Sequence, residues 1–225
     1  MAEDTILKFP WLQRKESGNA CEIMLDKSPS NIRERRAKFN FQFWQLRTPL
    51  TKYAIEGVYP YALDNGCFSG KLSPSWPRLL KEARSIRPVF VCSPDVVGSA
   101  RRTMDLFSHF ERQLSGLPTA LVLQDGINDV SIPWSKIDAV FVGGTDDFKL
   151  SEEAFAAARC AKLIGKWVHV GRVNTPDRLK GWLDFADSID GSGISRYDWM
   201  LQKVVDVIRG RTPLLQAPEE DYPWM

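Results

Sequence analysis

The chain has 225 residues, 44% of them hydrophobic and 26% charged, and its formal net charge is +2. This composition is typical of a globular protein with a sizeable core, and the small net charge does not by itself indicate a nucleic-acid-binding protein. A transmembrane helix is excluded because no run of about 18 apolar residues occurs. The start MAEDTILKFPW has no basic segment followed by an apolar stretch, so we expect a cytoplasmic protein with no membrane partner.

Residues 1–58 contain two apolar runs, CEIML (21–25) and FQFWQL (41–46), which predict the first two strands. Between them lies the basic run IRERRAKF (32–39), whose cations are Arg33, Arg35, Arg36 and Lys38. Such a run is often a solvated helix face. This one leads directly into the aromatic stretch FNFQFW (39–44), and cations beside aromatic rings suit phosphates and bases. We therefore predict that this N-terminal segment contacts nucleic acid.

From residue 59 to residue 212 the chain alternates short apolar runs with amphipathic stretches. The apolar runs are YPYALDNG (59–66), PVFVCSPD (88–95), TALVLQDG (119–126), DAVFVGG (138–144), KWVHVGR (166–172) and DSIDG (187–191). They are rich in Val, Phe and Leu without strict alternation, as expected of buried parallel strands. With the two earlier runs they make eight strands, and no Gly-x-Gly-x-x-Gly turn indicates a Rossmann sheet. We predict an α/β fold, a single-domain (β/α)8 TIM-like barrel, with a C-terminal tail over residues 213–225.

Four stretches between these runs are predicted to be helical: 99–114, 151–164, 174–185 and 195–208. Ser151 and Thr175 are predicted N-caps, because each is a hydroxyl residue directly before a helical pattern. The last helix is predicted to open with a capping box from Ser195 to Asp198.

Polar or glycine residues follow most of the predicted strands. In chain order they are Asp64, Asp95, Gln124, Gly143, Gly144, His169, Arg172 and Asp190. Each one alone is explained as a turn former. In a barrel, however, the carboxyl ends of all strands meet at one mouth, where the chemistry of such proteins takes place. We therefore predict that these residues share one site, with His169 as a packed or hydrogen-bonded residue.

Asp64 and Asp190 are separated widely in sequence, yet they would face each other across this mouth. Two opposed carboxylates suit chemistry at the anomeric carbon of a sugar, where one attacks and the other moves a proton. Asp95 and Gln124 together offer acceptors and an amide donor for the edge of a purine. Gly143 and Gly144 leave backbone N–H groups open to a flat ligand.

These residues, in this order, resemble the tRNA-guanine transglycosylase superfamily, whose members exchange guanine for a 7-deazaguanine on a nucleic acid. ALDNGCF (62–68) is similar to the family's Asp-Ser-Gly-Gly-Phe segment, which implies a general acid/base role for Asp64. HVGRVNTPDRLKGWLDFADSIDG (169–191) is similar to its Met-Gly-Val-Gly-Thr-Pro-Glu-Asp-Leu run ending in Asp-x-x-Asp, which implies that Asp190 is the nucleophile. The resemblance covers residues 60–193.

The resemblance also implies the base-binding residues. SPD (93–95), LVLQDG (121–126) and FVGG (141–144) are similar to the segments in which the family holds and reads the base. The base contacts that the resemblance implies are Asp95, Gln124, Gly143 and Gly144 in these segments, and Val170 in the HVGR stretch (169–172). Arg172 and Arg196 lie near the predicted strand ends and are expected to contact phosphates.

The chain departs from the family in lacking its zinc module of clustered cysteines and a histidine. The four cysteines, Cys21, Cys67, Cys92 and Cys160, are scattered, so we expect reduced core residues, no metal and no cofactor. A short form without zinc resembles the branch, often carried by bacteriophages, that places 7-deazaguanines such as preQ0 into DNA. The resemblance therefore implies DNA modification that protects against nucleases, with DNA and a free 7-deazaguanine base as partners.

Three alternatives stay open at this point. A tRNA-directed enzyme would use the same carboxylates on another nucleic acid. An N-glycoside hydrolase would let water resolve the sugar intermediate. A nucleobase-binding protein would hold the base without reacting.

Overall fold

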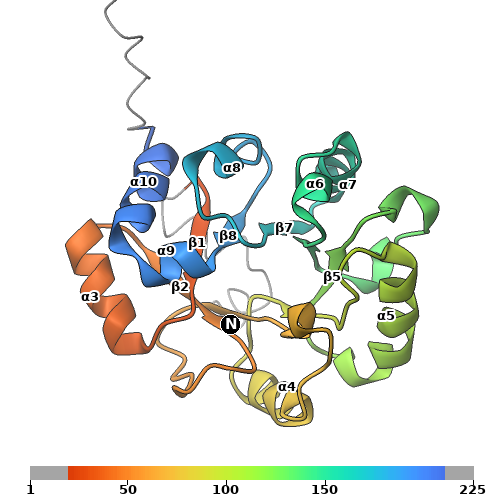
Figure 1. The fold of residues 1–225 in the computed structure, drawn as a ribbon. Coiled ribbons are helices and arrows are strands. Elements are labelled where there is room, and N and C mark those ends of the chain that lie inside the picture. The colour runs from red at the N-terminus through yellow and green to blue at the C-terminus, as the bar shows by residue number, and fades with distance from the viewer. Residues whose placement is uncertain (1–19, 211–225) are drawn as a thin grey trace, which may run out of the picture.

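A closed ring of eight parallel strands forms the centre of the molecule (Figure 1). The structure, a computed structural model, describes residues 20–210. Each strand pairs with the next along the chain, and the eighth pairs with the first, as in Met24 opposite Asp190. The prediction of a single-domain (β/α)8 barrel is confirmed.

All eight strands overlap the segments predicted for them. They are β1 (Glu22–Leu25), β2 (Phe43–Arg47), β3 (Tyr61–Leu63), β4 (Val91–Cys92), β5 (Thr119–Leu123), β6 (Ala139–Val142), β7 (Trp167–Val170) and β8 (Ser188–Asp190). The helices that surround the ring are α3 (Pro29–Phe39), α4 (Trp76–Ser85), α5 (Ala100–Leu114), α6 (Asp146–Lys149), α7 (Glu152–Leu163), α8 (Pro176–Lys180), α9 (Ser192–Arg196) and α10 (Asp198–Ile208). None of these helices has the length and apolar character needed to cross a bilayer.

Two of these helices begin at the N-cap residues that the sequence predicted. The side chains of Ser151 and Thr175 accept the backbone N–H groups of Ala154 and Arg178, so both predicted N-caps are confirmed. The helix predicted over 174–185 is shorter than expected and ends at Lys180.

The capping box predicted from Ser195 to Asp198 is wrong. Ser195 lies inside α9, and the residue before α10 is Tyr197, which makes no side-chain cap bond. The Asp198 carboxylate instead accepts Lys38 Nζ at 2.6 Å and Arg35 Nη2 at 2.9 Å, both from α3. The Asp198 side chain therefore pairs with residues of another helix and does not cap its own.

Side chains fill the barrel in two layers, because successive residues of a strand point to opposite faces. One cluster lies between strands and helices, and another fills the inside of the ring. In β7, Trp167 belongs to the inner cluster, where it stacks on Trp44 with 5.6 Å between ring centroids. Val168 and Val170 of the same strand belong to the outer cluster.

The aromatic stretch 39–44 does not form the base-stacking surface that its sequence predicted. Phe39, Phe41 and Phe43 pack in the outer core, and Trp44 points into the ring. None of the four is more than 5% exposed. Phe43 and Trp44 belong to β2, which is covered on both faces in a closed parallel barrel. Phe39 and Phe41 pack against the Phe43 ring, so they are covered as well.

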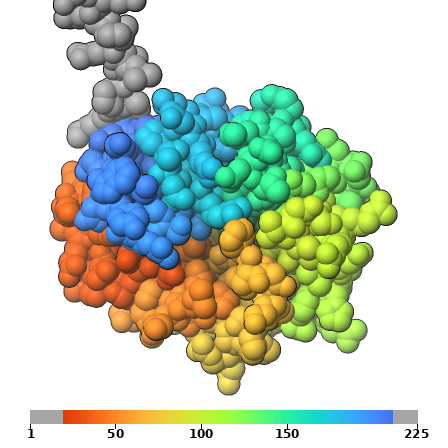
Figure 2. Space-filling view, in the orientation of Figure 1, coloured from red at the N-terminus to blue at the C-terminus, as the bar shows by residue number. Residues whose placement is uncertain are grey.

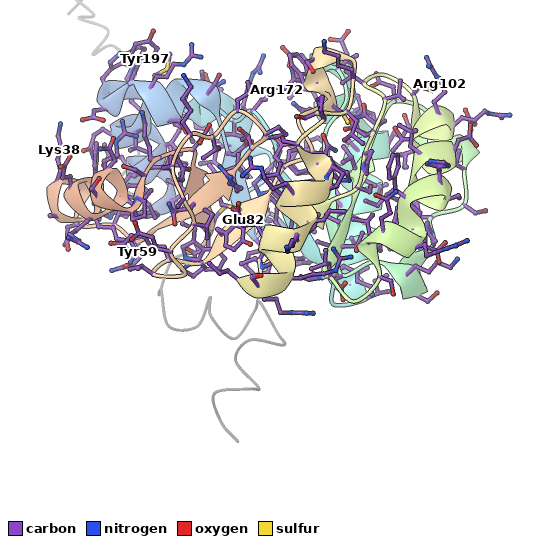
Figure 3. The ribbon with its side chains drawn as sticks, turned by 90° about the horizontal axis from the view of Figure 1, so that it is seen from below. Lys38, Tyr59, Glu82, Arg102, Arg172 and Tyr197 are labelled. Atoms are coloured by element: carbon purple, nitrogen blue, oxygen red, sulfur yellow. The ribbon has the colours of Figure 1, made fainter. Side chains whose placement is uncertain are left out.

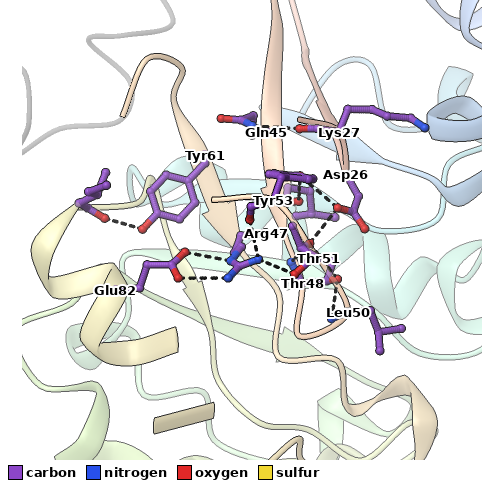
Figure 4. Close-up of polar contacts among 12 residues, drawn as sticks. Asp26, Lys27, Gln45, Arg47, Thr48, Leu50, Thr51, Tyr53, Tyr61 and Glu82 are labelled. Atoms are coloured by element: carbon purple, nitrogen blue, oxygen red, sulfur yellow. Dashed lines mark hydrogen bonds and ion pairs between the residues drawn. The ribbon is translucent and has the colours of Figure 1, made fainter. Parts of the chain in front are cut away.

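An ion pair fixes the loop between β2 and β3 (Figure 4). Arg47, at the end of β2, is 3% exposed and makes two bonds to the Glu82 carboxylate of α4, at 2.9 and 3.1 Å. Its remaining donors bind the carbonyl oxygens of Thr51 and Tyr53. The backbone carbonyl of Arg47 accepts the N–H of Asp64 at 2.8 Å, so this cluster anchors the residue that follows β3.

The predicted C-terminal tail, residues 213–225, lies outside the described residues, as do residues 1–19 of the predicted N-terminal segment. Three cysteines (Cys21, Cys67 and Cys92) are buried as expected. Cys160, in contrast, is exposed on α7.

Candidate active site

The loops that follow the strands form one face of the barrel, which faces the viewer in Figures 1 and 2 and lies at the top of Figure 3. A cavity opens within this mouth. It is lined by Asp64, Asn65, Phe68, Cys92, Asp95, Val97, Val122, Gln124, Phe141, Gly143, Gly144, Lys149, Arg172 and Asp190. The structure therefore brings together seven of the residues that the sequence predicted for one site: Asp64, Asp95, Gln124, Gly143, Gly144, Arg172 and Asp190.

Asp190 is the last residue of β8 and is held through one oxygen. Its Oδ1 accepts the backbone N–H of Arg172 at 2.7 Å. Arg172 adopts a left-handed backbone conformation, with φ of 60°, which is unusual for a residue with a side chain. Within residues 20–210, no hydrogen bond is made to Oδ2 of Asp190, so this oxygen is available to a ligand.

A chain of hydrogen bonds inside the barrel ends at His169, next to the same carboxylate. The indole Nε1 of Trp167 donates to Ser188 Oγ at 2.8 Å, and Ser188 Oγ lies 2.8 Å from His169 Nδ1. We infer that the Ser188 hydroxyl, which accepts from the indole, donates its own proton to Nδ1. The neutral imidazole then carries its proton on Nε2, which lies 3.7 Å from Asp190 Oδ1, too far for a hydrogen bond. His169 is fully buried, so the prediction of a packed, hydrogen-bonded residue is confirmed.

The carboxyl of Asp64 follows β3 and accepts the backbone N–H of Gly66 at 3.0 Å. Burial raises the pKa of Asp64 to about 7, and the nearby charge of Asp190 acts in the same direction. Near neutral pH, both the protonated and the ionised form of a carboxyl with this pKa are populated. A group that both donates and accepts a proton during a reaction needs both forms.

Asp95 is anchored by two side-chain amides. Asn65 Nδ2 donates to its Oδ1 at 2.8 Å, and Gln124 Nε2 donates to its Oδ2 at 2.5 Å. The carbonyl of Gln124 accepts the N–H of Gly98 at 2.9 Å. Burial raises the pKa of Asp95 above its ordinary value, although both amide bonds oppose this shift. Asn65 Nδ2 also donates to the Ser93 carbonyl, at 2.5 Å. The three side chains form one polar wall, which offers the second N–H of the Gln124 amide and the remaining carboxylate lone pairs.

The two glycines after β6 leave room for this wall. A Cβ on Gly143 would lie 2.7 Å from Val122 Cγ1 and 2.9 Å from Gln124 Nε2. Gly144 has φ of 73°, a conformation that favours glycine. A side chain at Gly143 would displace the Gln124 amide, so the glycine keeps the polar wall in place.

Arg172 lies at the rim of the cavity (Figure 3). Its guanidinium donates to the Gly144 carbonyl at 2.8 Å and stacks over the ring of Phe68, 4.3 Å from the centroid. Phe68 follows β3 and is 66% exposed. These contacts join the loops after β3, β6 and β7 across the mouth.

Lys149, at the end of α6, was missed by the sequence analysis. It lines the cavity and is 6% exposed. Its Nζ has no hydrogen-bond partner among the described residues. Burial and the neighbouring Arg172 charge lower the pKa of Lys149 to about 8. No sequence signal could identify it, because α6 is a four-residue helix and only the folded loop turns this side chain inward.

Val170 is not among the residues that line this cavity, and its predicted contact with the base stays a prediction. The residue is fully buried in the outer core. Alternation along β7 explains this, because His169 faces the inside of the ring and its neighbour must face the helices.

The predicted phosphate contacts are scattered. Arg35 and Lys38 pair with Asp198, and Arg36 donates to the Phe43 carbonyl and stacks on Tyr59. Arg33 and Arg196 are exposed.

Burial raises the pKa of the Cys67 thiol to about 11 and that of Cys92 well above its ordinary value. Both thiols therefore stay protonated near neutrality, which makes them poor nucleophiles. Within residues 20–210, no group of three or more His, Cys, Asp or Glu side chains is arranged to hold a metal ion.

No protein-family model and no curated protein matches this chain. Among solved structures, it is similar to tryptophan synthase from the hyperthermophile Pyrococcus furiosus, with 12% identity and a TM-score of 0.49 over 86% of this chain and 96% of that chain. It is also similar to a flavocytochrome B2 mutant, with 12% identity and a TM-score of 0.48. That match covers 85% of this chain and 62% of the flavocytochrome chain. Likeness at this level carries no inference about activity.

Proposed function

We propose that this chain is a base-exchanging pentosyltransferase, which replaces guanine in DNA with a 7-deazaguanine such as preQ0. The observation that carries the proposal is the shared cavity of Asp64 and Asp190, close enough that the charge of one raises the pKa of the other. One carboxyl is held by its neighbours with an oxygen left open, and the other titrates near neutrality. This is the division of roles that displacement at an anomeric carbon requires.

The first displacement breaks the bond between the sugar and guanine. Oδ2 of Asp190 attacks C1′, the electron pair of the C1′–N9 bond passes to N9, and protonated Asp64 gives its proton to the departing base. The product is a sugar joined to Asp190 through an ester-like bond, with Asp64 ionised. The Arg172 N–H on Oδ1 orients the attacking carboxylate.

The second displacement reverses these events with a new base. Asp64 removes the N9 proton of the 7-deazaguanine, the N9 electron pair attacks C1′, and the bond to Asp190 breaks. The anomeric configuration is retained, because two inversions follow each other. The wall of Asp95, Asn65 and Gln124 supplies the donors and acceptors that would hold either base by its edge.

The charge of the cavity supports an uncharged ligand. Asp64, Asp95 and Asp190 face the cations Lys149 and Arg172, and one carboxyl of the three is neutral when Asp64 is protonated. The two remaining carboxylates then balance the two cations, so the cavity needs neither a cationic nor an anionic ligand to neutralise it. A purine base meets this condition.

The test is incorporation of labelled guanine into DNA, with mass spectrometry of the nucleosides when 7-deazaguanines are added. Asp190→Asn should lose at least about 10³-fold in rate, whereas Asp177→Asn, an exposed carboxylate of α8, should exchange like the wild type. Parallel reactions on tRNA decide the nucleic acid. Abasic sites without incorporation would instead identify a hydrolase, and binding of the base without either reaction would identify a binding protein.

A further inference from the structure

Two aromatic side chains are exposed where α9 ends and α10 begins. Tyr197 is 52% exposed and Trp199 is 58% exposed, and their ring centroids lie 6.5 Å apart with the planes tilted by 33°. Trp199 is the most exposed tryptophan within residues 20–210. Because Leu201 faces the core, a residue two positions earlier on the helix points the opposite way. The fold therefore holds both rings outward.

Cations surround this pair. Lys203 Nζ lies 5.2 Å from the ring centroid of Trp199, and Arg196 is exposed one residue before Tyr197. Asp198, between the two aromatic residues in sequence, binds Arg35 and Lys38 of α3. These two ion pairs hold the basic run of α3 at the start of α10, where the exposed rings lie.

The patch of Arg196, Tyr197, Trp199, Lys203 and Lys38 (hereafter the aromatic corner) lies mainly on the two helices that follow β8, the strand that ends in Asp190. α9 starts at Ser192, two residues after Asp190. The Asn174 side chain accepts the N–H of Gly193 at 2.7 Å, which ties α9 to the loop after β7. In Figure 3, Tyr197 lies at the same end of the barrel as Arg172. A strand that enters the cavity can therefore pass over the corner.

We propose that the aromatic corner is a stacking platform for unpaired bases next to the nucleotide in the cavity. Tyr197 and Trp199 would stack on bases, and Arg196, Lys203 and Lys38 would neutralise the adjacent phosphates. This pairing of exposed rings with cations fits a single-stranded nucleic acid better than an apolar protein surface. The proposal rests on the proposed function only in naming the cavity as the place to which the strand leads.

The experiment measures the affinity of a fluorescent single-stranded DNA oligonucleotide by anisotropy, at several salt concentrations. Stacking contributes about 1–3 kcal/mol per base, so Trp199→Ala and Tyr197→Ala should each weaken binding by about 5- to 150-fold. Trp199→Phe should keep most of the affinity. Leu163→Ala is the matched control, because Leu163 is an exposed apolar residue of α7, at 87% exposure. Thermal unfolding of each variant checks that the fold is intact.

The outcomes separate this inference from the proposed function. Asp190→Asn should bind the oligonucleotide like the wild type although exchange is lost. If the wild type binds DNA through the corner but exchanges no guanine, the platform stands and the proposed function fails. If Trp199→Ala and Tyr197→Ala bind DNA as tightly as Leu163→Ala does, the platform is refuted. It is equally refuted if the two substitutions weaken binding only to vesicles of anionic lipid.

Discussion

His169 Nε2 lies 3.7 Å from Asp190 Oδ1, at the boundary between the fully buried interior of the barrel and the cavity that Asp190 lines. The Ser188 hydroxyl, which accepts the Trp167 indole proton, sets which imidazole nitrogen carries the hydrogen. Nε2 has no hydrogen-bond partner among the described residues. It lies beside the oxygen that already accepts the Arg172 N–H, so Oδ2 of Asp190 stays open to the cavity.

The tautomer of His169 is the first prediction. The neutral ring should carry its proton on Nε2, visible in the nitrogen shifts of a long-range proton–nitrogen NMR spectrum. The chain has two histidines, so His109→Gln assigns the spectrum without ambiguity. Ser188→Ala removes the group that fixes the ring and should produce a mixture of tautomers. A proton found on Nδ1 in the wild type would contradict the assignment.

The pH dependence of guanine release is the second prediction. Asp64 must be protonated to act as the acid, and burial raises its pKa to about 7. The kcat/KM for guanine release should therefore fall as pH rises through about 7. In Asp190→Asn the neighbouring charge is gone, so the Asp64 carboxyl, followed by carbon NMR, should titrate at lower pH than in the wild type. Asp146→Asn, at an exposed ion pair with Arg178, should leave it unchanged. Titration of wild-type Asp64 near 3.8 would exclude it as the acid.

Lys149 gives the third prediction, which concerns stability. The difference between the ordinary pKa of 10.5 and the value of about 8 in the fold corresponds to about 3 kcal/mol. The folded state disfavours the protonated amine, so this cost is fully present below about pH 8 and disappears as pH rises toward 10.5. Lys149→Met should therefore be more stable than the wild type at neutral pH, and the advantage should shrink with rising pH.

Denaturant unfolding at several pH values measures this effect. Lys81→Met is the control, because Lys81 is exposed on α4 and its substitution should change the free energy of unfolding little. A loss of stability in Lys149→Met would show that the amine is paired in solution. A gain of stability together with weaker binding of the base would indicate that the lysine is retained for the ligand.

Gly143 gives the fourth prediction. A Cβ at this position would lie 2.9 Å from Gln124 Nε2 and 3.2 Å from the Leu123 carbonyl, so Gly143→Ala should push the amide away from Asp95. We expect guanine affinity, measured by calorimetry, to fall about tenfold, which equals about 1.4 kcal/mol. Gly181→Ala, at the end of α8, has its nearest contact at Phe155 at 3.2 Å and should bind guanine normally. If Gly143→Ala binds guanine with unchanged affinity, Gln124 does not take part in base recognition.

The sequence predicted the strands and much of the cavity because both depend on local pattern. An apolar run that is followed by Asp64 or Asp190 predicts both the strand and the polar residue at its carboxyl end. The burial of Val170 and of the aromatic stretch 39–44 was not predicted, because which neighbours cover a residue depends on the whole barrel. Lys149 and the pairing of Asp198 with α3 were not predictable, since they depend on contacts between segments far apart in the chain.

The seam of the barrel has a consequence for synthesis. Asp190 belongs to the strand that closes the ring against β1, while Asp64 is made more than a hundred residues earlier. Under the proposed function, a nascent chain carries the proton-transfer group long before it carries the attacking one. A ribosome-bound fragment that stops short of β8 should therefore exchange no base.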